Sequence, residues 1–275
     1  MIDLSQLKLA LFDLDVTIRT NRGFPNEILK AFGNLKLNSI QTSVVTGTGY
    51  IRLKQIFGSK FSDICTLNTP IAVENGGRIT DHYGTNLKYY SLSKKEICRL
   101  IKLWLNQNND SFLYFFPKVS TEKAVIVPLN ISLHEKLINK YGSFTKVLKN
   151  SNSIELLTNY IYELKPCMVS HHFYKKTFIQ DQLKGFNVVQ NEGDIHINKK
   201  GIDKRQALID VMSLTKVSPD KILIVGNGLN DLPMLTYPYG KKIVVGNLIK
   251  KKLFKNNVDF VKNPKHLGQF LLNSI

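Results

Sequence analysis

Short apolar runs alternate with amphipathic segments at both ends of the chain. The runs that predict buried strands span residues 7–12, 41–45, 221–225 and 242–245. The segments with apolar residues at helical spacing span residues 26–32, 204–214 and 248–254. Because parallel strands need crossover connections, this alternation is typical of a parallel sheet with helices on both faces. The pattern therefore predicts an α/β core with a doubly wound parallel sheet.

The middle of the chain has a different pattern. It begins with a capping box, in which Ser93 precedes a helix and Glu96 stands three positions later. Helix and strand signals then follow without regular alternation, which favours an α+β domain. We therefore expect residues 1–80 and 199–275 to form the core, and residues 81–198 to form a domain inserted between its halves. The apolar positions of the first inserted helix, which we expect to pack in a core, are Ile97, Leu100, Ile101 and Trp104.

Composition limits the class of protein further. The chain has 275 residues and 43% hydrophobic content, which is enough for a large core. No segment resembles a signal peptide or reaches the roughly 20 apolar residues that span a bilayer, so we expect a soluble cytoplasmic protein without a membrane partner. The three cysteines, Cys65, Cys98 and Cys167, are widely spaced, which favours reduced thiols over a disulfide framework.

The charge is strongly positive, with 38 basic and 21 acidic residues and a net charge of +17. Such a charge attracts anions, so a small phosphorylated metabolite or a nucleic acid would suit it as a partner. A simpler interpretation stays open, in which a chain rich in Lys, Asn and Ile uses its lysines only to solvate the surface. The basic run at residues 250–252 has no aromatic residues among it and no RNA-binding signature, so a nucleic-acid partner is not favoured.

Two carboxylates and a hydroxyl follow the first predicted strand. Asp13, Asp15 and Thr17 come directly after the apolar run at residues 7–12. Open α/β sheets bind ligands outside the carboxyl ends of such strands, and two acids one residue apart can both address one metal ion or one phosphoryl group. The alternative is that these residues cap the next element or solvate a turn.

Two further segments add groups that can bind phosphate. Thr46 and Gly47 follow the run at residues 41–45, and a hydroxyl together with backbone N–H groups exposed by a glycine turn can hold phosphate oxygens. Lys204 lies in the first turn of the predicted helix at residues 204–214, where a cation opposes the helix dipole by about 0.3–1 kcal/mol. Such a position suggests pairing with an anion. The alternatives are an ordinary turn for the first segment and a solvated surface charge for the second.

A polar turn follows the third predicted strand. Asn227 and Asp231 supply oxygen ligands of the kind that Mg²⁺ accepts together with waters and a substrate phosphate. Gly226 and Gly228 would permit a tight turn there. The alternative is that Asn230 or Asp231 is a helix cap.

The order of these segments resembles the haloacid dehalogenase (HAD) superfamily. That family has Asp-x-Asp-x-Thr after the first strand, then a Thr or Ser, then a Lys, and finally Gly-Asp-Gly-x-x-Asp. The matching positions here are Asp13, Asp15, Thr17, Thr46, Lys204, Asn227 and Asp231. Residues 74–77, Glu-Asn-Gly-Gly, resemble the segment before the inserted domain in the Cof-like, type IIB sugar phosphatases. The resemblance implies a Rossmann-like core with an inserted C2-type cap domain.

The resemblance also implies a mechanism and a cofactor. It makes Asp13 the nucleophile that forms an aspartyl-phosphate, and Asp15 the general acid and base, with Lys204 as the third catalytic residue. The groups that it places on the phosphate are Leu14, Thr17, Thr46, Gly47, Lys204 and Asn230, and those that it places on Mg²⁺ are Asp13, Asp15, Asn227 and Asp231. The expected activity is Mg²⁺-dependent hydrolysis of a small phosphorylated metabolite, such as a sugar phosphate.

Three positions depart from the family pattern. Asn227 replaces the usual Asp, which should lower metal affinity. Val16 replaces a frequent glycine, so we expect a negative φ there, because a β-branched residue resists the left-handed region. Thr48 stands where many relatives have arginine. Two alternatives therefore stay open: a weakened relative that binds a phosphorylated ligand without turnover, and a phosphotransferase similar to phosphomannomutases, which residues 201–205 also resemble.

Overall fold

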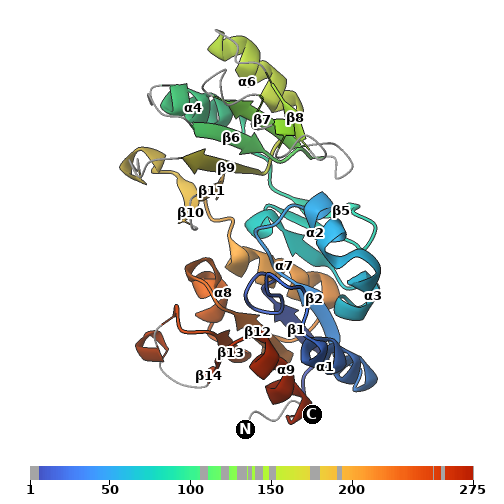
Figure 1. Cartoon of the computed structure of the whole chain (residues 1–275). Coiled ribbons are helices and arrows are strands. Elements are labelled where there is room, and N and C mark those ends of the chain that lie inside the picture. The colour runs from blue at the N-terminus through green and yellow to red at the C-terminus, as the bar shows by residue number, and fades with distance from the viewer. Residues whose placement is uncertain are drawn as a thin grey trace. The chain divides into compact units, whose positions relative to one another are not determined.

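The computed structural model describes residues 6–105, 111–118, 124–128, 135, 138–139, 145–148, 153–173, 180–190, 194–249, 251–254 and 258–274 (Figure 1). The chain divides into two compact units. Unit 1 comprises Met1–Thr48, Leu53–Lys88 and Asp203–Ile275, and unit 2 comprises Gly49–Arg52 and Tyr89–Ile202. Unit 1 is thus assembled from both ends of the chain. Its main boundaries lie at 88/89 and 202/203, whereas the sequence-based proposal placed them at 80/81 and 198/199.

The central sheet of unit 1 has five strands in the order β14-β13-β12-β1-β2. Each of its strand pairs is parallel. The strands are β1 (Leu9–Phe12), β2 (Gln41–Val44), β12 (Ile222–Gly226), β13 (Lys241–Val245) and β14 (Val258–Val261). β2 lies on one side of β1 and the later strands lie on the other, so the order reverses between β1 and β12. Open α/β sheets bind ligands at such a switch point, outside the carboxyl ends of the strands.

Helices cover both faces of this sheet. Successive side chains of a strand point to opposite faces, and all four residues of β1 are apolar and buried, so both faces need packing partners. Leu9 and Leu11 of β1 pack in one cluster with apolar residues of α7 and α8. Phe12 faces the other side, where its ring lies 4.7 Å from that of Phe32 in α1, and α1 packs against α9. The helices are α1 (Asn26–Leu37), α7 (Lys204–Thr215), α8 (Leu232–Leu235) and α9 (Pro264–Leu272). The predicted doubly wound parallel sheet is confirmed.

A small sheet completes unit 1. Its strands, in the order β3-β4-β5, are β3 (Ile71–Val73), β4 (Arg78–Thr80) and β5 (Asn86–Tyr89). A parallel bridge between Val45 and Ala72 places β3 beside the end of β2. The loop after β2 and the turn at residues 74–77 are therefore neighbours. The segment between them contains α2 (Tyr50–Phe57) and α3 (Phe61–Ile64).

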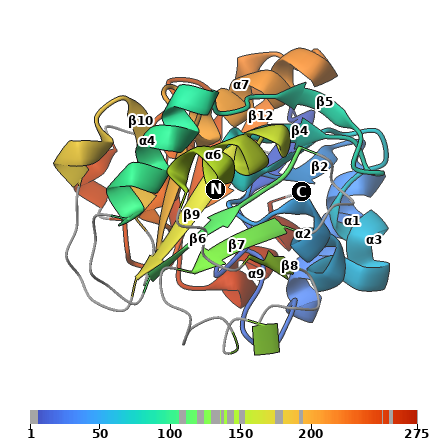
Figure 2. The same cartoon turned by 90° about the horizontal axis from the view of Figure 1, so that it is seen from above.

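Unit 2 is an α+β domain with a six-stranded sheet in the order β10-β11-β9-β6-β7-β8. Its strands are β6 (Ser111–Phe115), β7 (Ala124–Pro128), β8 (Thr145–Val147), β9 (Met168–Phe173), β10 (Phe186–Gln190) and β11 (Asp194–Lys199). The pair β7–β8 is parallel and the other four pairs are antiparallel. Helices α4 (Lys94–Leu105) and α6 (Ile154–Glu163) cover one face of this sheet (Figure 2). The expected α+β character of the inserted region is confirmed.

Local predictions had mixed outcomes. The capping box is confirmed, because Ser93 N–H donates to Glu96 Oε2 at 2.7 Å and Glu96 N–H donates to Ser93 Oγ at 3.3 Å. The stripe that ends in Trp104 is buried, as expected. The predicted helix at residues 248–254 is wrong: Lys250 lies outside the described residues, and Lys251–Leu253 form one 3₁₀ turn. Leu248 and Leu253 stay 66% and 50% exposed, whereas Ile249 and Phe254 pack against the core, so only part of the apolar face that would stabilise a longer helix is buried.

The structure bears on two expectations from composition, reduced cysteines and the absence of a membrane-spanning segment. All three cysteines are free, as expected for reduced thiols. Among the residues placed by the structure, no helix is both long enough and apolar enough to cross a membrane.

Candidate active site

Asp13 directly follows β1 and so lies at the carboxyl edge of the central sheet. The backbone N–H of Asp13 donates to the carbonyl of Val225 at 2.8 Å, which ties the end of β1 to β12. Only 5% of the residue is exposed. Its Oδ2 accepts a 2.8 Å hydrogen bond from the hydroxyl of Thr17, and the same hydroxyl lies 3.1 Å from Oδ1 of Asn227. Side chains from the ends of two adjacent strands therefore meet at the switch point.

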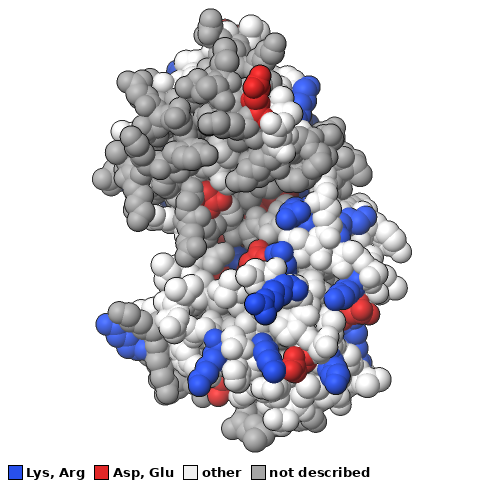
Figure 3. All heavy atoms as spheres, viewed as in Figure 1, with Lys and Arg blue, Asp and Glu red and all other residues white. Residues whose placement is uncertain are grey.

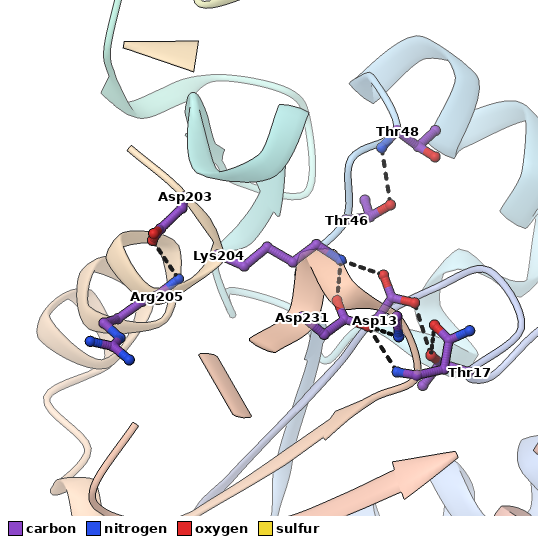
Figure 4. Close-up of polar contacts among 10 residues, drawn as sticks. Asp13, Thr17, Thr46, Thr48, Asp203, Lys204, Arg205 and Asp231 are labelled. Carbon is purple, nitrogen blue, oxygen red and sulfur yellow. Dashed lines mark hydrogen bonds and ion pairs between the residues drawn. The ribbon is translucent and has the colours of Figure 1, made fainter. Parts of the chain in front are cut away.

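Lys204 lies between two carboxylates (Figure 4). Its Nζ is 2.5 Å from Asp13 Oδ1 and 2.6 Å from Asp231 Oδ1. Lys204 is the first residue of α7, and the carboxylate of Asp203 caps this helix by accepting hydrogen bonds from two backbone N–H groups of the first turn. The negative charge of the cap offsets the unfavourable position of the lysine in the helix dipole. An Asp directly before a helical segment is a known cap signal, so the sequence contained the information for this cap.

Burial and charge together set the protonation of this cluster. Burial, followed by the negative charge of Asp231, raises the pKa of Asp13 from 3.8 to about 6, although Lys204 and Thr17 act in the opposite direction. Burial alone lowers the pKa of Lys204, but the two carboxylates more than offset this effect, so the pKa lies above its ordinary value of 10.5. Lys204 is therefore a cation at neutral pH, and with both acids ionised the cluster carries one net negative charge.

Asp231 uses its two carboxylate oxygens differently. Oδ2 accepts hydrogen bonds from the backbone N–H groups of Asn227 at 2.8 Å and Gly228 at 2.9 Å, whereas Oδ1 faces Lys204. The alternative that Asp231 is a helix cap is thus correct in part: Oδ2 accepts the N–H of Gly228, which precedes the 3₁₀ turn Leu229–Asp231, but Asp231 makes no side-chain cap hydrogen bond to α8. A Cβ at Gly226 would lie 2.7 Å from the Cβ of Asp231, and Gly226 does not have a positive φ. Glycine is therefore required at position 226 because a larger residue would collide with the side chain of Asp231, and not because the backbone there has a positive φ.

The loop after β2 supplies another hydroxyl. Thr46 is buried, and its Oγ1 accepts a 3.0 Å hydrogen bond from the backbone N–H of Thr48 (Figure 4). Because this contact uses a lone pair of the oxygen, the hydroxyl hydrogen can still be donated to an acceptor. Gly47, between these two residues, is half-buried.

Asp15 does not join the cluster. Its side chain is 54% exposed, and its Oδ1 lies 2.5 Å from Nη1 of Arg19. Of the four side chains that the sequence predicts to share one site, Asp13, Lys204 and Asp231 contact one another, whereas the carboxylate of Asp15 contacts Arg19. The sequence contained a signal for this contact, since opposite charges stand four positions apart.

The two remaining predicted phosphate contacts lie in the neighbouring loops. Leu14 is buried, and its carbonyl accepts the backbone N–H groups of Ile18 and Arg19, which closes the loop after β1. Asn230 is half-buried in the 3₁₀ turn before α8, and its side chain folds over Gly228, where a Cβ would lie 2.5 Å from Asn230 Oδ1.

Comparison with known families identifies the chain. The family described as haloacid dehalogenase-like hydrolase matches residues 10–265. The chain belongs to this family. The matched region contains all of the motif positions from Asp13 to Asp231, and the resemblance predicted from the sequence is confirmed.

Individual relatives agree with this assignment. A protein of Streptococcus pyogenes serotype M6 named "Putative bifunctional phosphatase/peptidyl-prolyl cis-trans isomerase" is 21% identical over 258 residues, 93% of this chain and 51% of the relative. The chain thus spans about half the length of that protein. BT1666 of Bacteroides thetaiotaomicron, described among HAD phosphatases, has a TM-score of 0.76 at 16% identity, with 98% of this chain and 96% of that chain covered. The HAD subclass IIB sugar phosphatase BT4131 has a TM-score of 0.73 at 12% identity, with coverage of 97% and 98%. The fold is that of the Cof-like, subclass IIB branch.

Val16 adopts the conformation that we expected it to avoid. Its φ is 64°, in the left-handed region, so the expectation of a negative φ is wrong. The backbone N–H of Val16 donates to the carbonyl of Arg19 at 2.9 Å, and this loop hydrogen bond holds the residue in place. The conformation costs of the order of 1–3 kcal/mol for a non-glycine residue. The loop after β1 thus holds a β-branched residue in a conformation that favours glycine.

The oxygen donors in this HAD site fit a hard divalent cation. Asp13 and Asp231 are buried carboxylates, and the amide oxygen of Asn227 contacts the same hydroxyl as Asp13. Mg²⁺ is commonly held by one or two carboxylates, with waters and substrate phosphate oxygens completing the shell. Within the described part of the chain, no three His, Cys, Asp or Glu side chains form a metal-holding group by themselves. Carboxylates alone therefore do not complete a shell here.

Proposed function

We propose that the protein is a Mg²⁺-dependent phosphatase that hydrolyses a small phosphorylated metabolite, most simply a sugar phosphate. The observation that carries the proposal is the ammonium group of Lys204 between the buried carboxylates of Asp13 and Asp231. This arrangement puts a nucleophile, a cation and a metal-ligating acid within contact distance of one another. Membership of the HAD hydrolases supports hydrolysis, and the relatives named as phosphatases support a phosphate ester as substrate.

In the first step, a carboxylate oxygen of Asp13 attacks phosphorus while the bond from phosphorus to the leaving oxygen breaks. Asp15 gives its proton to the leaving oxygen, which departs as an alcohol. To reach that oxygen, the Asp15 carboxyl rotates away from Arg19, and its half-exposed position leaves room for this rotation. The product of this step is an aspartyl-phosphate on Asp13.

In the second step, a water oxygen attacks phosphorus and the bond to Asp13 breaks, which releases inorganic phosphate. Asp15, now ionised, takes a proton from the attacking water. The negative charge on the nonbridging oxygens is held throughout by fixed donors in a buried site, where they are most effective. The proposed donors are Lys204, the hydroxyl of Thr46, the backbone N–H groups of Leu14 and Gly47, and the side chain of Asn230, while Thr17, whose hydroxyl donates to Asp13, orients the nucleophile.

Mg²⁺ would be held by Asp13, Asp231, the amide oxygen of Asn227 and the carbonyl of Asp15. When bound, it supplies positive charge beside the phosphoryl oxygens. The chain's own contribution is to hold these donors at the ends of β1 and β12, where burial keeps bulk water from competing with them.

A second candidate is a relative that binds a phosphorylated ligand without turnover. Two observations favour it: the contact of Asp15 with Arg19 leaves the proposed acid outside the cluster, and Asn227 contributes no charge to a metal. If the ion pair holds Asp15 permanently, the leaving oxygen receives no proton and the reaction stops.

Release of phosphate from p-nitrophenyl phosphate, with and without Mg²⁺, separates the two candidates. Asp13→Asn keeps the size of the side chain but removes the nucleophile, and we expect it to lower the Mg²⁺-dependent rate by about a thousandfold or more. Asp63→Asn, a change at an exposed residue of α3, is the matched control and should keep the wild-type rate. Equal background rates for the wild type and Asp13→Asn would rule out the phosphatase and leave the binding protein.

A further inference from the structure

The turn between β3 and β4, residues 74–77, has an unusual backbone. Glu74 and Asn75 have φ angles of 56° and 53°, in the left-handed region that glycine adopts readily and other residues adopt only with strain. Both residues are buried, with 2% and 0% of their surface exposed. Such a conformation persists only where the surroundings impose it. The proposed chemical steps do not use these side chains, so the contacts of the turn have to explain its position.

One side of the turn holds the loop after β2. The backbone N–H of Asn75 donates to the carbonyl of Thr46 at 2.9 Å, and that of Glu74 donates to the carbonyl of Thr48 at 3.3 Å. The two consecutive left-handed residues direct both N–H groups toward this loop. The strained backbone thus fixes the residue whose hydroxyl we place on the phosphate.

The other side of the turn supports the start of α7. A Cβ on Gly76 would lie 2.6 Å from the carbonyl oxygen of Asp203 and 2.9 Å from the Cβ of Ala207. The turn is therefore in direct contact with the residue that precedes Lys204. Through these contacts it sets the spacing between the loop of Thr46 and the end of α7.

A buried ion pair holds the turn in this conformation. Oε2 of Glu74 lies 3.2 Å from Nε of Arg78, and the two side chains are only 3% and 1% exposed. Buried ion pairs often contribute little to stability when compared with apolar residues of the same size, because both charges must leave water. Their better-supported use is to specify one conformation among several, which is what a strained turn between two functional segments requires.

We propose that Glu74, Gly76 and Arg78 are positioning residues that set the distance between Thr46 and Lys204 for binding of the phosphoryl group. The inference rests on the proposed function, because it assumes that both residues contact phosphoryl oxygens. It predicts that disturbing the turn lowers the rate of the chemical step even in a folded protein.

Gly76→Ala is the first test. The added Cβ must displace Asp203, and with it Lys204, so we expect kcat for p-nitrophenyl phosphate to fall about 10- to 100-fold, with KM changed less than about threefold. Gly185→Ala is the matched control: Gly185 has a φ of +98°, close to the +90° of Gly76, and an added Cβ there would meet only the end of the Arg99 side chain at 3.5 Å, so it has the torsional strain without the close contact. This control should keep the wild-type kcat.

The double variant Glu74→Gln/Arg78→Met is the second test. It removes both charges of the ion pair together, so neither of the two is left buried without the other, and we expect the protein to stay folded. At a temperature well below the unfolding midpoint, with the folded fraction checked by circular dichroism, kcat should again fall about tenfold or more. A wild-type kcat in this folded variant, or in folded Gly76→Ala, overturns the inference and leaves the proposed function intact.

Failure of the proposed function would be recognised separately, by the absence of Mg²⁺-dependent turnover in the wild type. Binding of inorganic phosphate, measured by titration calorimetry, then replaces kcat as the readout. Binding that is about tenfold weaker in Gly76→Ala than in the wild type supports the inference. Equal affinities, or no phosphate binding by the wild type, overturn it.

Discussion

The residue at position 227 sets the charge available to a metal ion. Asp13 and Asp231 contribute two negative charges, Lys204 offsets one of them, and Asn227 adds an oxygen without charge. Affinity for a hard cation rises with the number of charged ligands. A site of this composition should therefore bind Mg²⁺ weakly until substrate phosphate adds negative charge of its own.

Asn227→Asp should strengthen the binding of Mg²⁺ to the protein without substrate by about tenfold, or about 1.4 kcal/mol. Titration calorimetry with Mg²⁺ measures this directly and does not depend on turnover. Asn230→Asp adds the same charge three positions later, on a side chain that folds over Gly228, and should have a smaller effect. Equal affinities for the wild type and Asn227→Asp would show that the amide is not beside the metal.

Val16 is a second single residue with a measurable cost. It is 58% exposed, so replacing it loses little buried surface, while its φ of 64° strains a β-branched side chain. Val16→Gly should increase the free energy of unfolding by about 1 kcal/mol, after allowing for the greater flexibility of glycine in the unfolded chain. Thermal unfolding should shift upward by about 2–4 °C. Val16→Ala, which keeps a Cβ, should gain less, and a lower midpoint for Val16→Gly would contradict this explanation.

Among the secondary-structure elements, α7 has the largest part in building the site. Asp203 caps its first turn, and Nε of Arg205 donates to the carbonyl of Pro233 in α8 at 2.8 Å. Farther along the helix, the buried carboxylate of Asp210 lies 2.7 Å from Nζ of Lys88 in β5. The helix that begins with Lys204 is thus anchored at several points. This explains how one long side chain can be held between two carboxylates.

β9 places a histidine among apolar neighbours in unit 2. His171 stands opposite Leu113 on one adjacent strand and Ile195 on the other. Burial, together with the nearby His172, lowers the pKa of His171 from 6.5 to about 4. Between these two values the unfolded chain binds a proton that the folded chain does not bind.

Stability should consequently fall as the pH is lowered from about 6.5 toward 4, by about 1.4 kcal/mol per pH unit from His171 alone. The stability that the neutral His171 contributes is fully present above pH 6.5, the pKa in the unfolded chain, and is lost as the pH falls toward about 4, the pKa in the folded chain. Urea unfolding of the whole chain at about pH 7, 6 and 5 measures it as the difference between the wild type and His171→Leu, because the raised pKa of Asp13 contributes in the opposite direction to both proteins. His171→Leu removes the titrating group and should remove this loss from the profile, whereas an unchanged slope would exclude this histidine as the cause.

For the molecule as a whole, the dominant property is its net charge of +17. Figure 3 shows Lys and Arg side chains spread across the visible face of unit 1, with fewer acidic side chains among them. A distributed positive charge attracts anionic substrates over long distances, provided that the field reaches the site. The alternative is that the lysines only solvate the surface.

Ionic strength distinguishes these interpretations. If the field steers a phosphate ester to the site, kcat/KM should fall several-fold between about 10 mM and 100 mM salt, because the screening length shrinks from about 30 Å to about 10 Å. kcat at saturating substrate should change little. A flat kcat/KM profile would support lysines that act only as solvated surface groups.

Much of the fold was predictable because its signals are local. The strands β1 and β12 are buried apolar runs, and α7 has apolar residues at helical spacing, so their extents follow from short stretches of sequence. The same reasoning is wrong for residues 248–254, where helical spacing is present but Leu248 and Leu253 stay exposed while Ile249 and Phe254 pack against the core. Periodicity predicts an element only when tertiary packing buries its apolar face.

The sequence by itself determined which residue types stand at the ends of β1, β2 and β12, and their order was sufficient to indicate the HAD family. Only the tertiary structure decided that Lys204 joins Asp13 and Asp231, that Asp15 turns toward Arg19, and that Val16 adopts a positive φ. For Lys204 the physical reason is that its two carboxylate partners come from segments far apart in the chain, which no local pattern contains. For Asp15 and Val16 the contacts with Arg19 are local, but the sequence allowed more than one conformation of the loop after β1, and only the folded loop selected one of them.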